Sequence, residues 1–265
     1  MPAYRPYEPY EGLQTQIDGE GVLVATLDRP ERLNAFNGPL RKSIRALIDD
    51  VASDDAVRVL VLTGNGRGFC SGADLTAEDR SPVPVALHDP AFAWCVDLLE
   101  VPKPTIAAVN GVAAGGGLGF ALLCDIRICS TEARLLPIWM KRAIHPDDLI
   151  TWTLPRLVGM GRALHWLYLA EEIPLDDAVS SGLVHSVVEP DELLPTTMDL
   201  AGRLAAMPPM HLALTKQAML KGMTRDPWDA AAIESWGQGK AMSSEDFAEG
   251  VAAFRDRRQP RFTGR

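Results

Sequence analysis

A glycine-rich run is the stretch of this sequence best suited to bind a ligand through its backbone. Residues 110–119 read Asn-Gly-Val-Ala-Ala-Gly-Gly-Gly-Leu-Gly, between a predicted strand and a predicted helix. Glycine allows close approach and positive φ, and the first turn of a helix carries free N–H groups. The run has neither the GxGxxG spacing of dinucleotide sites nor the Gly-Lys-Ser/Thr of a P-loop. It therefore predicts either a tight structural turn or a site for an incoming oxygen.

A second glycine-flanked turn lies earlier in the chain. Residues 69–75 read Phe-Cys-Ser-Gly-Ala-Asp-Leu and follow the loop Gly-Asn-Gly-Arg-Gly at 64–68. Taken alone, this stretch favours a structural turn. Taken together, the two turns can supply one N–H group each to a single carbonyl oxygen, the arrangement that stabilises an oxyanion.

The elements expected to hold these turns alternate between strands and helices. Apolar runs predict buried strands, and apolar spacing at three and four residues predicts helices. The expected strands are 22–27, 57–63, 105–110 and 125–129, and the expected helices are 39–52, 92–99 and one from about 118. From residue 138 the pattern is mostly helical, apart from 183–188. This order predicts an α/β or α+β fold with a helical C-terminal region.

Composition narrows the classes of function. The chain has 265 residues, 47% of them hydrophobic, and a formal net charge of −9. An acidic chain of ordinary hydrophobic content does not resemble a nucleic-acid binder. Its four cysteines have neither metal-ligand nor disulfide-scaffold spacing, so no metal site is expected. With no signal-like stretch and no apolar span free of glycine interruptions, we expect a cytoplasmic protein without membrane contact.

An ordered set of motifs makes the sequence resemble the crotonase superfamily, the enoyl-CoA hydratase/isomerase family. Most of the chain from about residue 20 takes part in the resemblance. The motifs are Asp-Arg-Pro-Glu-Arg-Leu-Asn-Ala at 28–35, Val-Leu-Val-Leu-Thr-Gly at 59–64, the turn at 69–74, Pro-Thr-Ile-Ala-Ala-Val-Asn-Gly at 104–111, the triplet at 115–117, Pro-Arg-Leu-Val-Gly at 155–159, Glu-Gly-Val-Ala-Ala-Phe at 249–254 and Pro-Arg-Phe at 260–262.

The resemblance implies a fold, a ligand and an assembly. It implies a spiral of ββα turns over residues 1–205, with a helical oligomerisation region over 206–265 that forms a homotrimer or a dimer of trimers. It also implies an acyl-CoA thioester substrate, with coenzyme A as part of the substrate and no tightly bound cofactor. The backbone N–H groups of Ala73 and Gly116 would form the oxyanion hole.

The chain departs from the hydratases of this family at both catalytic glutamates. Counted without gaps, the two glutamate positions are occupied by Gly119 and Trp139. Neither residue can activate water or deliver a proton, so general acid–base help worth roughly 10²–10⁴-fold is missing. We therefore expect weak hydration at most.

An aspartate eight residues after Trp139 offers a different chemistry. Isomerases of the superfamily, including those that act on ring-opened phenylacetyl-CoA, resemble this chain in placing a proton-shuttling aspartate at the position of Asp147. The alternative is that Asp147 or Asp148 caps the helix expected from about residue 149. Asp148 is expected to be an acidic residue of that helix's first turn.

The 4-chlorobenzoyl-CoA dehalogenases provide a competing resemblance. They have the Gly-Gly-Gly-Leu-Gly run, a tryptophan at position 139 and a nucleophilic aspartate at position 147. Their catalytic histidine, however, corresponds to Phe92, and His88 lies one helical turn away. The missing or displaced base makes aryl substitution the weaker alternative.

Other residues are candidates for binding rather than chemistry. Trp139, Gly119 and Phe92 are expected to line the acyl pocket. His145 either assists Asp147 or binds substrate, or is simply a loop histidine. The candidates for the phosphates of coenzyme A are Arg29, Arg32 and Arg261.

These observations favour an enoyl-CoA isomerase. The thioester oxygen would lie between Ala73 and Gly116 while Asp147 moves a proton through a dienolate. The alternatives are a family member with weak or no hydration, a dehalogenase-like enzyme, and a non-catalytic acyl-CoA-binding protein.

Overall fold

The computed structural model describes residues 4–75 and 92–265. Seven strands of this described part form one sheet in the order β1-β2-β3-β4-β6-β8-β10. From β3 onward all neighbours in the sheet are parallel, and β1 and β2 add an antiparallel edge. The bounds are β1 (Arg5–Pro6), β2 (Leu13–Ile17), β3 (Val22–Leu27), β4 (Val59–Gly64), β6 (Thr105–Val109), β8 (Ile126–Ser130) and β10 (Ser186–Val188).

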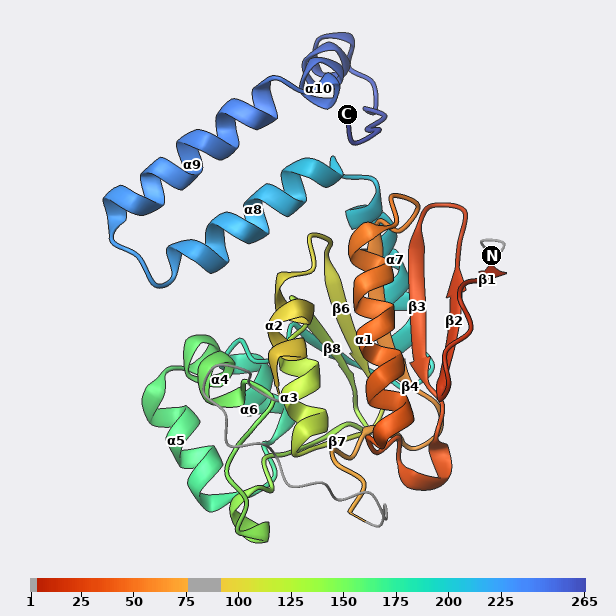
Figure 1. Ribbon diagram of the computed structural model, residues 1–265, viewed down its shortest axis with the longest axis vertical. Helices are drawn as coiled ribbons and strands as arrows, with labels where there is room; N and C mark the ends of the chain where they lie inside the picture. The colour runs from red at the N-terminus through yellow and green to blue at the C-terminus, as the bar shows by residue number, and fades with distance from the viewer. Residues whose placement is uncertain (1–3, 76–91) are drawn as a thin grey trace.

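The two faces of this sheet are covered by different helices, which explains its nearly continuous apolar strands. Val22 and Val24 point toward α7 (Leu193–Ala205), together with Val59 and Val61. The alternate side chains of the same strands join the larger core, where α1 (Gly38–Ser53) packs through an apolar stripe. Figure 1 shows α1 and α7 on opposite faces of the sheet.

A second, three-stranded parallel sheet lies beside the first and carries the two glycine turns. Its strands are β5 (Gly68–Cys70), β7 (Val112–Ala114) and β9 (Arg134–Leu136). Each follows a long strand of the first sheet, so that β4-β5-α2, β6-β7-α3 and β8-β9-α4 repeat one ββα pattern. This repeat confirms the predicted ββα spiral.

The remaining helices enclose one end of the spiral and extend beyond it. Their bounds are α2 (Ala93–Glu100), α3 (Gly116–Leu122), α4 (Ile150–Val158), α5 (Met160–Leu169), α6 (Leu175–Ser180), α8 (Pro209–Gly222), α9 (Pro227–Met242) and α10 (Glu245–Asp256), with short 3₁₀ turns η1 (Pro30–Arg32) and η2 (Met140–Arg142). None of the helices in the described part is long and apolar enough to cross a membrane.

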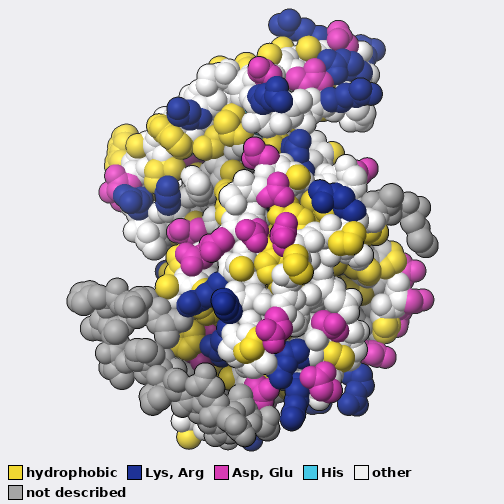
Figure 2. Space-filling view, turned by 45° about the vertical axis from the view of Figure 1, so that its right-hand side comes forward, with side chains coloured by type: hydrophobic (Ala, Val, Ile, Leu, Met, Phe, Trp, Pro, Cys, Tyr) yellow, Lys and Arg dark blue, Asp and Glu magenta, His cyan; other side chains and the backbone are white. Residues whose placement is uncertain are grey.

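Helices α8, α9 and α10 form an arm that projects from the spiral (Figure 1). Helix α8 has no buried residue, and α9 buries only Ala241 among its side chains. Hydrophobic side chains are exposed along this arm, and Lys and Arg gather at its tip (Figure 2). The division of the chain at residue 206 stays a prediction.

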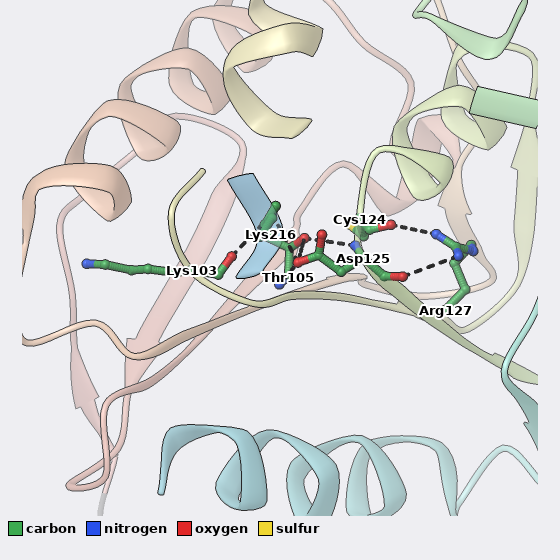
Figure 3. A network of polar contacts seen from close by, with 6 residues as sticks. All are labelled: Lys103, Thr105, Cys124, Asp125, Arg127 and Lys216. Atoms are coloured by element: carbon green, nitrogen blue, oxygen red, sulfur yellow. Dashed lines mark hydrogen bonds and ion pairs between the residues drawn. The ribbon is translucent and has the colours of Figure 1, made fainter. Parts of the chain in front are cut away.

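A polar network ties the arm to the sheet (Figure 3). Lys216 of α8 places Nζ 3.0 Å from Asp125 Oδ2 and 3.3 Å from the Lys103 carbonyl oxygen. Asp125 Oδ2 also accepts from the backbone N–H of Thr105 at 2.8 Å. Nearby, the buried Arg127 donates to the carbonyl oxygen of Cys124 at 2.5 Å.

The sequence predicted the long strands and helices within a few residues, but it missed four strands. β1, β2, β7 and β9 were not expected. The four cysteines are free and buried. His88 lies outside the described residues.

Candidate active site

The turn that carries Ala73 is held in a fixed orientation by the segment before α1. The N–H of Phe36 donates to the Gly72 carbonyl oxygen at 2.7 Å, and the N–H of Asp74 donates to the Phe36 carbonyl oxygen at 2.9 Å. These two bonds make Phe36 and Ala73 a parallel bridge. In such a bridge the N–H of the central residue points away from its partner strand. The Ala73 N–H therefore points away from Phe36.

Arg29 stabilises the turn that carries Ala73 through two contacts of its guanidinium group. Its Nη1 donates to the Ala35 carbonyl oxygen at 2.5 Å, and its Nη2 lies 3.1 Å from Asp74 Oδ2. Asn34, which is fully buried, accepts from the Arg29 N–H at 2.8 Å and donates to the Gly68 carbonyl oxygen at 2.7 Å. The Arg29 guanidinium is thus committed to the protein and positions the Ala73 turn.

The start of α3 packs directly on this turn, backbone against backbone. A Cβ atom on Gly117 would collide with the Cys70 carbonyl oxygen, so only glycine permits this approach. A Cβ atom on Gly72 would lie 3.0 Å from the Gly116 nitrogen. Gly116 is the first residue of α3, where a backbone N–H has no partner within the helix. The geometry brings the Ala73 and Gly116 turns together, as an oxyanion hole requires.

Trp139 and Asp147 form one unit beside this junction. Trp139 is 4% exposed, and its indole Nε1 donates to Asp147 Oδ1 at 2.7 Å. The hydrogen bond orients the half-buried carboxylate, which also forms a side-chain hydrogen bond with Asp148. The tryptophan at a glutamate position therefore holds a carboxylate supplied from eight residues further along the chain.

Two expectations for this segment were wrong. Helix α4 begins at Ile150 with Leu149 as its N-cap residue, and no side chain caps it, so Asp147 is not a helix cap. Asp148 precedes the helix and is not a residue of its first turn. The reason is a turn in which Asp148 (φ 50°) and Leu149 (φ 57°) both adopt the left-handed conformation, which rotates the Asp148 side chain inward.

The Asp148 side chain is buried against α3. It is 2% exposed. A Cβ atom on Gly116 would collide with Asp148 Oδ2, and a Cβ atom on Gly119 would lie 2.9 Å from the Asp148 Cβ. The space beside Gly119, where a hydratase glutamate would start, is therefore occupied by Asp148.

Burial controls the electrostatics of Asp148. It raises the pKa of this carboxyl to about 7, and the neighbouring Asp147 acts in the same direction. Arg41 of α1 and a hydrogen bond from Cys95 oppose the shift in pKa. The Cys95 Sγ donates to Asp148 Oδ1 at 3.6 Å. Burial also raises the pKa of the Cys95 thiol, which keeps it neutral.

An aromatic cluster forms the wall behind these groups. Phe120 of α3 contacts Phe36, Phe69 and Trp94, with ring centroids 5.6, 6.0 and 6.1 Å away. Phe92, at the start of α2, packs against the same core. The guanidinium carbon of Arg41 lies 5.6 Å from the centroid of the Phe36 ring. The wall is apolar, as a site that excludes water from an enolate requires.

The other predicted binding residues lie at different distances from the glycine turns. His145 is exposed, and its Nδ1 lies 2.6 Å from the Pro146 carbonyl oxygen. Arg32 is exposed beside the Ala73 turn, since its carbonyl oxygen accepts from Ser71 Oγ at 3.2 Å. Arg261 lies beside α10, where its N–H donates to Glu249 Oε1 at 2.8 Å. The C-terminal segment is far from β7 within this chain (Figure 1).

Sequence reasoning missed Asp148, Cys95 and Arg41 as neighbours of the site. The signal available for Asp148 was indirect: small residues at 116 and 119 leave space that some other side chain must fill. In the described part of the chain, no three His, Cys, Asp or Glu side chains gather closely enough to hold a metal ion.

Comparison with known proteins agrees with this architecture. The model of the enoyl-CoA hydratase/isomerase family matches residues 18–265. The chain is 38% identical over 255 residues to the 1,2-epoxyphenylacetyl-CoA isomerase of Escherichia coli K12, covering 93% of this chain and 96% of that protein. It is also 38% identical over 252 residues to the short-chain-enoyl-CoA hydratase of Clostridium acetobutylicum, covering 92% and 95%.

A solved structure extends the agreement to three dimensions. The enoyl-CoA hydratase subunit I from Geobacillus kaustophilus HTA426 superposes with a TM-score of 0.87 at 35% identity, covering 97% of this chain and all of that one. With its ββα spiral, its paired glycine turns and a family match over nearly its whole length, this chain belongs to the enoyl-CoA hydratase/isomerase family.

Proposed function

We propose that this protein isomerises an unsaturated acyl-CoA thioester, with Asp147 as the proton shuttle. Asp147 removes a proton from the carbon on one side of the double bond. The electron pair delocalises into the thioester carbonyl as a dienolate, and the same carboxyl returns the proton to another carbon of the conjugated system. The double bond shifts, and no atom is gained or lost.

The observation that carries the proposal is the arrangement of carboxylates around the glycine turns. A hydratase needs acid–base groups on either side of a water molecule, but the two positions that hold them in hydratases are Gly119 and Trp139. The room beside Gly119 is filled by Asp148. The Trp139 indole orients the Asp147 carboxylate, which supports the proposal that Asp147 acts as the base.

The backbone supplies the electrostatic part of the proposed mechanism. N–H groups of Ala73 and Gly116 would hold the thioester oxygen, and their hydrogen bonds strengthen as negative charge develops there. One such donor is typically worth about 3–4 kcal/mol in the transition state. The reaction moves a proton and needs neither a metal ion nor a redox cofactor.

Binding of the coenzyme A part would involve surface cations. Arg32 is exposed near the Ala73 turn and stays a candidate, whereas Arg29 is paired with Asp74. Arg261 lies on the arm, so it would serve the site of a neighbouring subunit if the arm mediates assembly.

The relatives are named for two different reactions. One relative is named as an isomerase of 1,2-epoxyphenylacetyl-CoA and another as a hydratase of short-chain enoyl-CoA. We favour isomerisation because this chain lacks both hydratase carboxylates. Dehalogenase-like substitution is disfavoured, because Phe92 packs into the core where that chemistry needs a base.

A panel of CoA thioesters tests the proposal. It should contain crotonyl-CoA, a 3-enoyl-CoA and arylacetyl-CoA compounds with unsaturated or epoxidised rings, each followed by the gain or loss of conjugated absorbance. We expect one or more double-bond shifts and only slow hydration of crotonyl-CoA. Brisk hydration of crotonyl-CoA, or binding without any turnover across the panel, would overturn the proposal.

A further inference from the structure

The position of Asp148 places a second carboxyl group at the oxyanion hole itself. Its Oδ2 lies so close to Gly116 that a Cβ atom there would collide with it. Gly116 also borders Gly72, the residue before Ala73. Gly116 is therefore close both to the Asp148 carboxyl and to the turn that carries Ala73. The Asp148 side chain is 2% exposed, so it is shielded from bulk water.

The backbone conformation that aims Asp148 inward is unusual. Asp148 and Leu149 are two consecutive non-glycine residues with positive φ. The turn is held by α4, because both the N–H and the Oγ1 of Thr153 donate to the Leu149 carbonyl oxygen, at 2.9 and 3.1 Å. A strained conformation that the surrounding structure stabilises is often found at functional sites. Here its result is to bury a carboxyl group.

The surroundings of Asp148 favour its neutral form. Its hydrogen-bond partners are the Cys95 thiol at 3.6 Å, a weak donor, and the Asp147 carboxyl group. Burial is the largest influence and raises the pKa of Asp148 to about 7, and the hydrogen bond to Asp147 acts in the same direction. A buried carboxylate next to a second carboxyl group is unfavourable, so it takes up a proton instead.

The negative charge of the enolate also favours the protonated form of Asp148. An ionised Asp148 beside Gly116 would repel the negative oxygen that the same N–H group holds. A protonated Asp148 would instead donate a hydrogen bond to that oxygen. A carboxylic acid kept neutral by an apolar site can serve in this way as an oxyanion donor.

We propose that Asp148 acts as a protonated carboxylic acid that donates a third hydrogen bond to the enolate oxygen, alongside the N–H groups of Ala73 and Gly116. This inference rests on the proposed function only in that the thioester oxygen binds between those two groups. Asp147 remains the base, so the two adjacent aspartates have different roles.

Apart from Asp147, the ionisable groups that face Asp148 do not change their charge near pH 7. Cys95 of α2 stays a thiol because burial raises its pKa, and burial raises the pKa of Cys70 of β5 to about 12. Arg41 of α1 contributes a permanent positive charge. From α3, glycines 116 and 119 face it. Asp147 is the remaining acidic group beside Asp148.

Kinetic pH profiles of three proteins test this assignment on the best substrate of the panel. For the unsubstituted enzyme, kcat should decline as the pH rises through about 7. Asp148→Asn keeps a hydrogen-bond donor without a titrating proton, so its alkaline decline should disappear. Asp148→Ala removes the donor, and its kcat should be about 10²–10³-fold below that of the unsubstituted enzyme, with Asp148→Asn at least about tenfold above Asp148→Ala.

A measurement without turnover separates this inference from the proposed function. Acetoacetyl-CoA forms an enolate whose ultraviolet absorbance reports the negative oxygen when the ligand binds. The affinity for this enolate should fall between pH 6 and 8.5 in the unsubstituted protein but not in Asp148→Asn. Comparison at equal pH cancels the ionisation of the ligand.

The outcomes are distinct. If enolate binding follows Asp148 while Asp147→Asn retains full activity, the assignment of Asp148 stands and the shuttle role of Asp147 fails. If enolate affinity has the same pH dependence in the unsubstituted protein, Asp148→Asn and Asp148→Ala, the assignment of Asp148 is overturned. Should the variants not fold, the unsubstituted enzyme alone decides, because a kcat without an alkaline decline above pH 7 contradicts the inference.

Discussion

Two neighbouring aspartates differ here through their surroundings rather than their chemistry. Asp147 is half-buried and receives the Trp139 indole N–H, whereas Asp148 is 2% exposed and receives a weak hydrogen bond from the Cys95 thiol. Burial favours the neutral form of Asp148. One step along the sequence thus separates a half-buried carboxyl group from a fully buried one.

The buried Asp148 should make stability depend on pH. Its pKa is about 7 in the folded protein, above the ordinary value of 3.8 for an aspartate. Between these values the folded state holds a proton that the unfolded state has released, so the free energy of unfolding falls as the pH rises. Above pH 7 this loss is complete, and Asp148→Asn should then be more stable than the unsubstituted protein by on the order of 2–4 kcal/mol.

Denaturant unfolding at pH 5 and pH 8.5 checks this expectation. The advantage of Asp148→Asn should be small at the lower pH and larger at the higher. Asp199→Asn is the matched control, since the Asp199 side chain is 76% exposed, and it should change stability little at either pH. An equal effect of Asp148→Asn at both pH values would show that Asp148 is not buried as a neutral acid.

At this scale the sequence identified only part of the site. Motif order pointed to Ala73, Gly116 and Asp147, and the structure brings their segments together. The order of the motifs could not identify Asp148, because Pro-Asp-Asp before an apolar run resembles an ordinary helix start. The inward rotation depends on Thr153 and on open space along α3, which are tertiary features without a local pattern.

The elements around the site fit together because α3 lacks side chains where other segments approach. Gly117 meets the Cys70 carbonyl oxygen of β5, and Gly119 meets the turn before α4. The glycines of this short helix therefore lie at the positions where neighbouring segments contact it. Any side chain at these positions would separate the Ala73 turn, α3 and the Asp148 turn.

Substitution of Gly119 by alanine measures how tightly α3 packs on that turn. The added Cβ would lie 2.9 Å from Asp148 Cβ and 3.2 Å from the Asp148 carbonyl oxygen. We expect a loss of about 1–3 kcal/mol from overpacking, together with a lower kcat as the Asp148 carboxyl moves. The measurement is denaturant unfolding with kinetics on the same samples.

Gly161→Ala in α5 provides the control, because its Cβ would meet nothing within 4 Å. Alanine favours the helix by up to about 1 kcal/mol relative to glycine, so this variant should gain stability and keep its activity. If Gly119→Ala behaves like Gly161→Ala, α3 does not pack against Asp148 as closely as described.

Element prediction succeeded where apolar patterns are long. Val22–Leu27 and Thr105–Val109 are buried on both faces and gave clear runs. β7 and β9 have three residues each, too few for periodicity, and β7 lies inside the glycine run. β2 was missed because Gln14 and Gln16 alternate with its apolar residues at the sheet edge, a pattern of only five residues.

At the scale of the whole molecule, the arm formed by α8, α9 and α10 exposes large apolar side chains. Met219 is 67% exposed, and Trp228 and Phe254 are each 87% exposed. Contiguous exposed apolar surface of this kind is typical of an interface. Apart from the Lys216 network, few side chains of the arm are buried against its own chain.

We therefore expect a homo-oligomer, a trimer or a dimer of trimers. Light scattering at micromolar concentration should give a multiple of the 28.8 kDa chain mass. Trp228→Glu combined with Phe254→Glu should weaken assembly by placing charge in the interface, whereas Lys42→Glu on α1, outside the arm, should not. A stable monomer of the unsubstituted protein would contradict the role of the arm.

The central claim is that Asp147 moves the proton. Asp147→Asn retains the shape of the side chain and can still accept the Trp139 indole N–H, so folding and thioester affinity should be preserved. The amide cannot accept a proton, so kcat on the best panel substrate should fall by about 10²-fold or more. Trp139→Phe, which removes only the indole donor, should cause a smaller loss.

Measurement of kcat for Asp147→Asn beside a binding measurement with the same thioester tests this claim most directly. We expect nearly unchanged affinity with kcat reduced by at least about 10²-fold. Unchanged kcat in Asp147→Asn would contradict the account, because the carboxylate assigned as the base would then be unnecessary for the reaction.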